Sequence, residues 1–247
     1  MNRTECEDTH SLLAAIDASV SQAKAGLEGV RLMYLECLEI TRSLSAMLGT
    51  PESLRDIVAV LNKLAAVENA LGNRDVASAM HDECLGITRR IVDATGTLQS
   101  RRDLAVALEN VAAFSSLRRD LDSALAACRE SMAISEQLLE LTDLPSEVHQ
   151  LVGSVRLVAA YLLAKGDAFA SAELLMLHAP KVDRLEAECG NDVGILDTCA
   201  AYRETQGRAA LAIGDSTAGN VFTAHGASLR ARIERITRDE SDGEANA

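Results

Sequence analysis

Aromatic residues make up only 2% of this 247-residue sequence, which has no tryptophan and only three prolines. Proline breaks helices, and strands favour aromatic and β-branched residues that alternate with polar ones. No stretch of strand length shows that alternation, whereas alanine and leucine, which are good helix formers, are abundant. With 48% hydrophobic residues, the chain has enough apolar surface to bury a core. These features predict an all-α protein.

Long hydrophobic segments are also missing. No stretch approaches about 18 apolar residues without a charge, which argues against a membrane span. Glu5, Glu7 and Asp8 give the N-terminus the wrong charge for a secretory signal. The cysteines, at positions 6, 37, 84, 128, 189 and 199, lack the close pairing typical of a zinc ribbon or a disulfide framework. We therefore expect a cytoplasmic protein without a membrane segment.

The sequence has fewer basic residues than acidic residues. Lysine and arginine number 24 against 37 for aspartate and glutamate, so the formal net charge is −13. Affinity for nucleic acid depends mainly on lysine and arginine side chains that neutralise phosphates. The charge therefore argues against a nucleic-acid partner and favours basic or amphipathic protein segments as partners.

The sequence repeats itself every 47 residues. Residues 36–44 (ECLEITRSL) return as residues 83–91 (ECLGITRRI) and again as residues 130–138 (ESMAISEQL). A fixed period of this size is typical of stacked supersecondary units. Such stacks form extended binding surfaces more readily than a dry catalytic cleft, so the repeat favours a binding function.

Each unit has the pattern of a helix, a short turn and a second helix. In the clearest unit, apolar residues at helical spacing run from Leu54 to Ala65, Gly72-Asn73 interrupts them, and a second set begins at Ala77. This pattern predicts five helical hairpins, and hence ten helices, in a single repeat domain. Their expected ranges are 8–48 with a turn near Gly26, 52–96, 100–142, 146–189 and 192–238, before an acidic frayed tail at 239–247.

These residues resemble the tetratricopeptide repeat family. Its pattern of a large residue, a leucine beside a small residue, a turn and further small residues is matched by Leu61, Leu64-Ala65, Gly72-Asn73, Ala77 and Cys84-Leu85. The next two units follow with Leu108, Val111-Ala112, Arg119-Asp120 and Ala124, and with Val155, Val158-Ala159, Gly166-Asp167 and Ser171. The unit here is longer and lacks the consensus tryptophan, so long-period bacterial members look closest. The resemblance implies a right-handed α-solenoid.

In the resembled family, the first helix of each hairpin lines a concave groove that holds a partner's peptide or helix. Carried over by repeat position, the expected groove residues are Asn62, Lys63, Asn69, Glu109, Asn110, Ser116, Arg156 and Arg203. Polar side chains there would orient a ligand's backbone, while neighbouring alanines would let it approach. The alternative is that these are ordinary solvated residues.

No catalytic, metal or cofactor site is expected. Cys37 and Cys84 occupy equivalent repeat positions, with Ser131 third in the series, which indicates small packing residues. His81 has Cys128 and Leu175 as its equivalents, so it is also expected to pack in the core. The spacing of cysteine and histidine does not suggest four converging zinc ligands. A Cys-His nucleophilic pair stays open as an alternative.

The leading hypothesis is a non-enzymatic scaffold or adaptor that binds a protein or peptide partner in the groove. By analogy, the partner is a signalling enzyme or a regulator. Two alternatives stay open. One is a regulatory solenoid that senses a peptide or small ligand, and the other is a structural protein that self-associates into homo-oligomers through its terminal hairpins.

Overall fold

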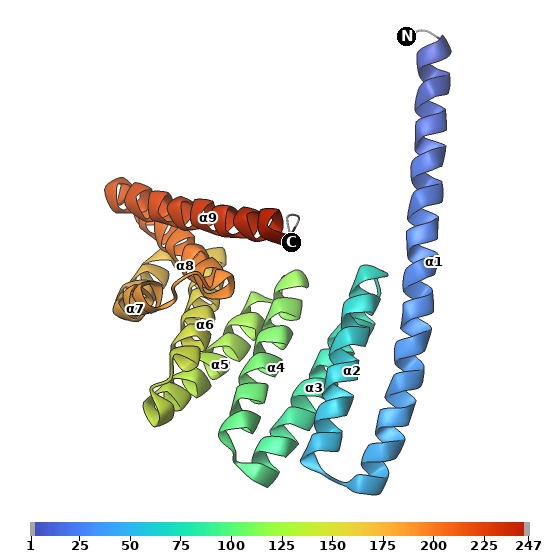
Figure 1. Cartoon of the computed structure of the whole chain (residues 1–247), viewed down its shortest axis with the longest axis horizontal. Helices are drawn as coiled ribbons and strands as arrows, with labels where there is room; N and C mark the ends of the chain where they lie inside the picture. The colour runs from blue at the N-terminus through green and yellow to red at the C-terminus, as the bar shows by residue number, and fades with distance from the viewer. Residues whose placement is uncertain (1–2, 245–247) are drawn as a thin grey trace. The chain divides into compact units, whose positions relative to one another are not determined.

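The structure is a computed structural model that describes the backbone of residues 3–244 and the side chains of residues 25–238. Over these residues the chain forms nine helices and no strands (Figure 1). The helices are α1 (Arg3–Leu48), α2 (Pro51–Ala70), α3 (Arg74–Thr95), α4 (Leu98–Leu117), α5 (Leu121–Thr142), α6 (Pro145–Ala164), α7 (Ala168–Glu188), α8 (Val193–Ala212) and α9 (Ser216–Glu244). They form two compact units, divided between Gly96 and Thr97. The all-α class is confirmed.

The expected hairpin at residues 8–48 is wrong, because α1 is one continuous helix that passes through Gly26. A glycine inside a helix costs only about 1 kcal/mol relative to alanine, and Gly26 has no positive φ that would turn the chain. The frayed tail also differs from expectation, since α9 continues to Glu244; residues 245–247 lie outside the described part of the chain. Helices α2 to α9 form four hairpins.

The four hairpins begin at regular intervals. Helices α2, α4 and α6 begin at Pro51, Leu98 and Pro145, which are 47 residues apart, and α8 begins 48 residues later, at Val193. The extra residue shifts every equivalent position in the last hairpin by one. The shift therefore changes which residue of α8 is equivalent to each expected groove residue of the earlier hairpins.

Each hairpin has a pair of equivalent small residues, one from each of its two helices. The pairs are Ala65 with Ala77, Ala112 with Ala124, Ala159 with Ser171, and Gly207 with Gly219; the first three pairs have no exposed surface. In the third hairpin the hydroxyl of Ser171 donates to the backbone oxygen of Ala159 at 2.9 Å. In the last, a Cβ added to Gly207 would clash with Thr223 Oγ1 and lie 3.1 Å from the backbone oxygen of Gly219, so alanine there would force its surroundings to shift.

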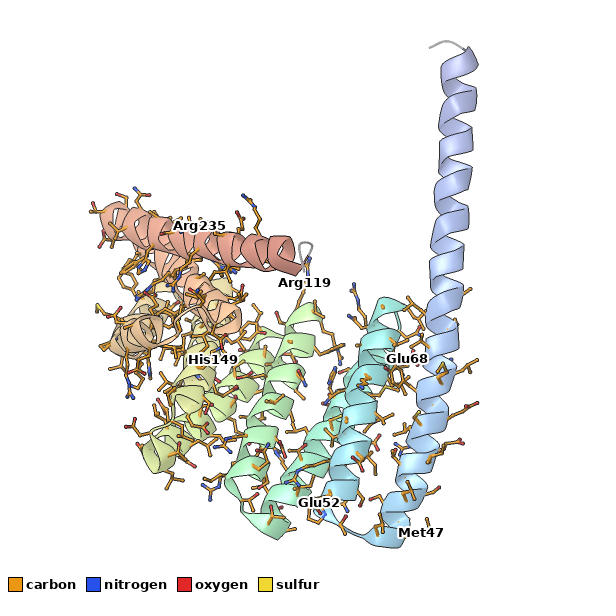
Figure 2. All side chains as sticks on the ribbon, viewed as in Figure 1. Met47, Glu52, Glu68, Arg119, His149 and Arg235 are labelled. Carbon is orange, nitrogen blue, oxygen red and sulfur yellow. The ribbon has the colours of Figure 1, made fainter. Side chains whose placement is uncertain are left out.

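The first unit, up to Gly96, has its own core. Leu38 of α1 packs against the buried faces of α2 and α3, which contribute Ile57, Leu61, Leu64, Cys84, Ile87 and Ile91. Buried Glu68 joins α2 to α1 (Figure 2), because Arg31 Nε donates to its Oε1 at 2.6 Å and Asn73 Nδ2 donates to its Oε2 at 2.7 Å. Burial raises the pKa of Glu68, but these hydrogen bonds outweigh it and hold the pKa below its ordinary value.

The second unit, from Thr97 onward, has a larger core that is continuous through α6, α7, α8 and α9. Its fully or nearly fully buried members include Val152, Val155, Ala159, Leu175, Val182, Leu185, Leu196, Cys199, Tyr202 and Leu229. Tyr202 is the largest of them, and its hydroxyl donates to the backbone oxygen of Leu175. Residues from four helices thus share one apolar interior, which fixes these helices relative to one another.

The turn inside each hairpin places one residue in the left-handed region. Three of the turns use glycine there, with φ of 88° at Gly72, 87° at Gly166 and 90° at Gly214, whereas the α4–α5 turn uses Arg119 at φ 63°. A residue with a Cβ is strained in this conformation by about 1–2 kcal/mol. The α4–α5 turn therefore has the most strained backbone of the four turns.

Replacing Arg119 with glycine should relieve this strain. We expect Arg119→Gly to raise the free energy of unfolding by about 0.5–1 kcal/mol, because glycine's greater freedom in the unfolded chain offsets part of the gain. Urea denaturation followed by circular dichroism measures the change. The neighbouring Arg118 has φ −83°, so Arg118→Gly should destabilise the protein and serves as the matched control. A loss of stability in both variants would contradict the prediction.

Candidate functional site

One face of α4 and α6 is exposed between rows of buried residues. On α4 the exposed or half-exposed residues are Val106, Glu109, Asn110, Ala113, Ser116 and Leu117, and on α6 they are Gly153, Arg156, Leu157 and Ala160. We call these ten residues the first-helix stripe. Their spacing of three and four places them along one side of each helix. The residues between them on α4, such as Leu104, Leu108 and Ala112, are buried.

Glu109 is the centre of a hydrogen-bond network that joins three helices. Its Oε1 accepts from Ser154 Oγ at 2.6 Å and Gln150 Nε2 at 3.0 Å, both on α6, and from Ser131 Oγ on α5 at 3.1 Å. Ser131 and Ser154 are themselves fully buried. Three donors on one carboxylate oxygen fix the side chain, so Glu109 positions α4 against α6 rather than reaching freely into solvent.

Further polar pairs connect the first helices of successive hairpins in the second unit. Arg102 Nε on α4 donates to Oε1 of Glu147 on α6 at 2.6 Å, and Glu147 has only 1% of its surface exposed. His149 Nε2 on α6 lies 2.7 Å from Thr198 Oγ1 on α8, and Figure 2 labels His149 on α6. These contacts hold α4, α6 and α8 in one layer.

The structure brings together several of the predicted groove residues around Tyr161. Ser116 hydrogen-bonds with Tyr161, and the charges of Arg156 and Glu109 also act on the Tyr161 hydroxyl. Burial raises the pKa of Tyr161 above its ordinary value. Asn110 lies one residue from Glu109 on the same face of α4. Glu109, Asn110, Ser116 and Arg156 therefore belong to one surface.

The other predicted residues are placed differently. Lys63 is exposed, and Asn62 and Asn69 are half-exposed, on α2 of the first unit. They occupy the same repeat positions on α2 as the stripe residues do on α4. They form a separate surface of the first unit.

Arg203 does not lie on an exposed face, which corrects the prediction for this residue. It is 3% exposed, its Nε donates to Glu186 Oε1 at 2.9 Å, and its Nη2 donates to Asp183 Oδ1, both on α7. Burial lowers the pKa of Arg203, but the ion pairs with Glu186 and Asp183 outweigh this effect and raise the pKa above its ordinary value. Because α8 begins one residue late, Glu204 takes the equivalent position, and it pairs with Arg230 Nε of α9 at 2.9 Å.

A pocket of about 490 Å³, which was not predicted from the sequence, lies between α7, α8 and the start of α9. Its walls include Phe169, Met176, Ile213 and Phe222, with Glu173 and Asp215 as acidic residues. Phe169 and Met176 are 74% and 72% exposed, which is unusual for large apolar side chains. Two of the three phenylalanines of the chain lie here. That concentration is the sequence signal that could have indicated the site.

The cysteines with buried side chains are not arranged for chemistry. Burial raises the pKa of the Cys84, Cys128 and Cys199 thiols to about 12, so they stay protonated and are poor nucleophiles. Within the described residues, histidine, cysteine, aspartate and glutamate do not gather in a group of three or more that could hold a metal ion. No helix in that part of the chain is long and apolar enough to cross a membrane.

Two histidines are buried in the helical layers. His81 and His178 are 6% and 4% exposed, and burial lowers the pKa of both side chains. Lys181 lowers the pKa of His178 further, while Glu136 lies 3.8 Å from its Nε2. His81 shares its repeat position with Cys128 and Leu175, which are also buried. These histidines therefore belong to the packed interior.

The hairpins, the small-residue pairs and the exposed stripe define a helical-repeat protein. Residues 57–94 and 104–144 match the family model of the tetratricopeptide repeat. These two segments therefore have the sequence pattern of the tetratricopeptide repeat. The match does not test the long-period subtype, which stays a prediction.

Solved structures support the same fold. BtubC (BKLC) from P. vanneervenii is 13% identical over 84% of this chain and 92% of its own, with a TM-score of 0.55. A variant of the Podosopora anserina putative kinesin light chain TPR-like repeats is 15% identical over 88% of this chain and 97% of its own, also with a TM-score of 0.55. At these identities the likeness shows the fold alone. No curated protein sequence matches the chain.

The buried histidines predict a pH dependence of stability. The folded-state pKa of His178 lies below its ordinary value of 6.5, so acidification protonates the unfolded chain first and the free energy of unfolding falls between pH 7 and pH 5. We expect His178→Asn to flatten this slope by up to roughly 1 kcal/mol per pH unit. Urea denaturation at pH 7, 6 and 5 measures it. Equal slopes in the variant and the original chain would contradict the assignment.

Proposed function

We propose that this protein is an interaction module in which the first-helix stripe of the second unit binds a peptide or helix of a protein partner. The observation that carries the proposal is a face of exposed and half-exposed residues on α4 and α6, two helices that the Glu109 network joins. Tetratricopeptide repeats generally mediate contacts between proteins. A rigid face costs little conformational entropy when a partner binds, which favours affinity.

The composition of the stripe suits a peptide ligand. Arg156 and Asn110 contribute charge and amide groups, whereas Ala113, Gly153 and Ala160 have side chains small enough for a backbone to approach closely. Val106 and Leu117 add exposed apolar surface at 47% and 54% exposure. An apolar strip with a few fixed polar groups is typical of sites that bind one face of an amphipathic segment.

The proposal gives the protein the role of an adaptor without chemistry of its own. The partner is, by analogy with other uses of this fold, a signalling enzyme or regulator in the cytoplasm. Asn62, Lys63 and Asn69 hold the equivalent repeat positions in the first unit, and we propose that they form a separate recognition surface there.

Selection from a random peptide display library tests the stripe without knowledge of the partner. Peptides enriched on the original chain should lose at least about tenfold in affinity for the double variant Asn110→Ala/Arg156→Ala, since a few polar anchors carry much of the energy of an interface. Fluorescence anisotropy measures the affinity. Gln137→Ala, at an exposed position on α5, is the matched control and should bind normally. Unchanged binding to the double variant would refute the stripe assignment.

The pocket between α7, α8 and α9 favours a second candidate function, which is sensing of a short peptide. Phe169, Met176 and Phe222 offer an apolar surface to one large side chain, and Glu173 and Asp215 place negative charge beside it. The fitting ligand is therefore an apolar residue followed by lysine or arginine. Such a peptide would bridge α7 and α9, and so would bias the position of the last hairpin.

The same display library tests the pocket. We expect some enriched peptides to carry an aromatic or leucine residue beside a basic residue, and Met176→Asp to weaken them at least about tenfold because it places a charge against the apolar anchor. Leu141→Asp, at a 63% exposed position on α5, is the control. If all enriched peptides bind Met176→Asp as well as the original chain, the pocket is not a peptide site.

A further inference from the structure

Helix α1 has an exposed row of apolar residues that the rest of the first unit does not cover. The row consists of Val30, Met33, Cys37, Ile40, Leu44 and Met47, which we call the α1 seam. Its members Met33, Ile40 and Met47 are 66%, 59% and 74% exposed. Figure 2 labels Met47 near the C-terminal end of α1. The fold and the first-helix stripe do not use this surface.

The seam is separate from the face that α1 turns to its own hairpin. Leu38 and Ser45 are buried at 5% and 8% exposure, and Ser53 Oγ of α2 donates to Ser45 Oγ at 3.1 Å. Arg42 Nη2 reaches Glu83 of α3 at 2.6 Å. This inner face already has its partners, so α1 carries a second apolar face that has none within the described residues of its unit.

The spacing of the seam identifies the kind of surface that would cover it. Its six residues follow one another at intervals of three, four, three, four and three, which is the a and d pattern of a heptad repeat. Side chains at this spacing pack as knobs into the holes of another helix. Upstream of Val30 the apolar residues leave this register, because the preceding d positions are Gly26 and Ser19.

The charges beside the seam favour a second copy of the same helix. The residues at the flanking e and g positions are Gly29, Tyr34, Glu36, Thr41, Ser43 and Leu48, of which only Glu36 is charged. Two such helices meet no row of like charges, even though the whole chain carries −13. A partner chosen by opposite charge would need a charged border, and the seam lacks one.

A lipid surface is a poorer fit. Helices that lie on membranes carry lysine or arginine on their polar face. Between residues 25 and 48, α1 has two arginines, and both are used inside the unit, by Glu68 and by Glu83. Glu28, Glu36 and Glu39 make the rest of this segment acidic. The seam is therefore apolar without the positive charge that anionic lipids attract.

We infer that the α1 seam is a dimerisation surface, on which α1 of a second copy packs as a two-stranded coiled coil. This inference goes beyond the proposed partner binding, because it concerns the first unit and does not depend on the first-helix stripe. Contact of two identical seams is isologous, so each copy buries the same six residues and the assembly closes at two chains.

Sedimentation equilibrium of the full chain at micromolar concentration tests the inference. We expect a molar mass near twice the 26.3 kDa of one chain, and a twofold lower mass for Ile40→Asp, which places a charge at a d position. Ile40→Leu should remain dimeric because leucine is favoured at d. Glu39→Lys, outside the seam, should also remain dimeric.

Circular dichroism separates loss of association from loss of folding. Ile40→Asp should keep the helical signal of α2 to α9 and a cooperative unfolding transition, because Ile40 does not belong to the core of the unit. A monomeric original chain at about 100 micromolar, within the range where exposed apolar surfaces associate, would overturn the inference. A dimer that persists unchanged in Ile40→Asp would overturn it as well.

Discussion

Buried small residues on both helices of each hairpin are the constraint on which the rest of the structure depends. The chain has almost no large aromatic residues with which to separate its helices, so Ala65, Ala112 and Ala159, with their buried equivalents on the second helices, set the distance. Closely spaced helices bury more of their leucine and valine side chains, and this burial stabilises the stack. In the last hairpin Gly207 and Gly219 bring the helices together even more closely.

The close packing leaves little room for polar groups, and the buried carboxylates have specific partners. Glu68 and Glu147 each face an arginine of another helix, and Glu109 accepts three hydrogen bonds. A buried carboxylate without such partners would cost several kcal/mol, so each of these residues specifies how its helices pair. The Glu109 network lies under the exposed stripe. The contacts that stabilise the second unit therefore also fix the surface proposed for recognition.

Much of this fold could be predicted from the sequence, because the repeat shows the same signals several times. Helical spacing, Gly72 and Gly166 in the turns and the buried alanines all identify hairpins.

The errors have local causes. Gly26 was expected to turn the chain, yet glycine only weakens a helix whose apolar spacing continues on both sides. Arg203 was assigned without the one-residue shift of α8, and a shift of one residue rotates a helical position by about 100°. The pocket depends on how α7 and α9 lie beside α8, which no local pattern encodes.

The exposed surfaces of the two units suggest how such a protein gains affinity from weak contacts. A stripe with a few polar anchors and small residues offers modest binding energy to any one peptide. Two copies joined along α1 would present two stripes in one assembly, and a partner with two matching segments would then bind the second segment from a high local concentration. This gain in affinity arises because the two copies are joined, and it requires no new contact at either stripe. A mutation on α1 that prevents dimerisation would thus lower the apparent affinity for a bivalent partner and leave the affinity for a single peptide unaltered. The two measurements would distinguish the contribution of α1 from that of the stripe.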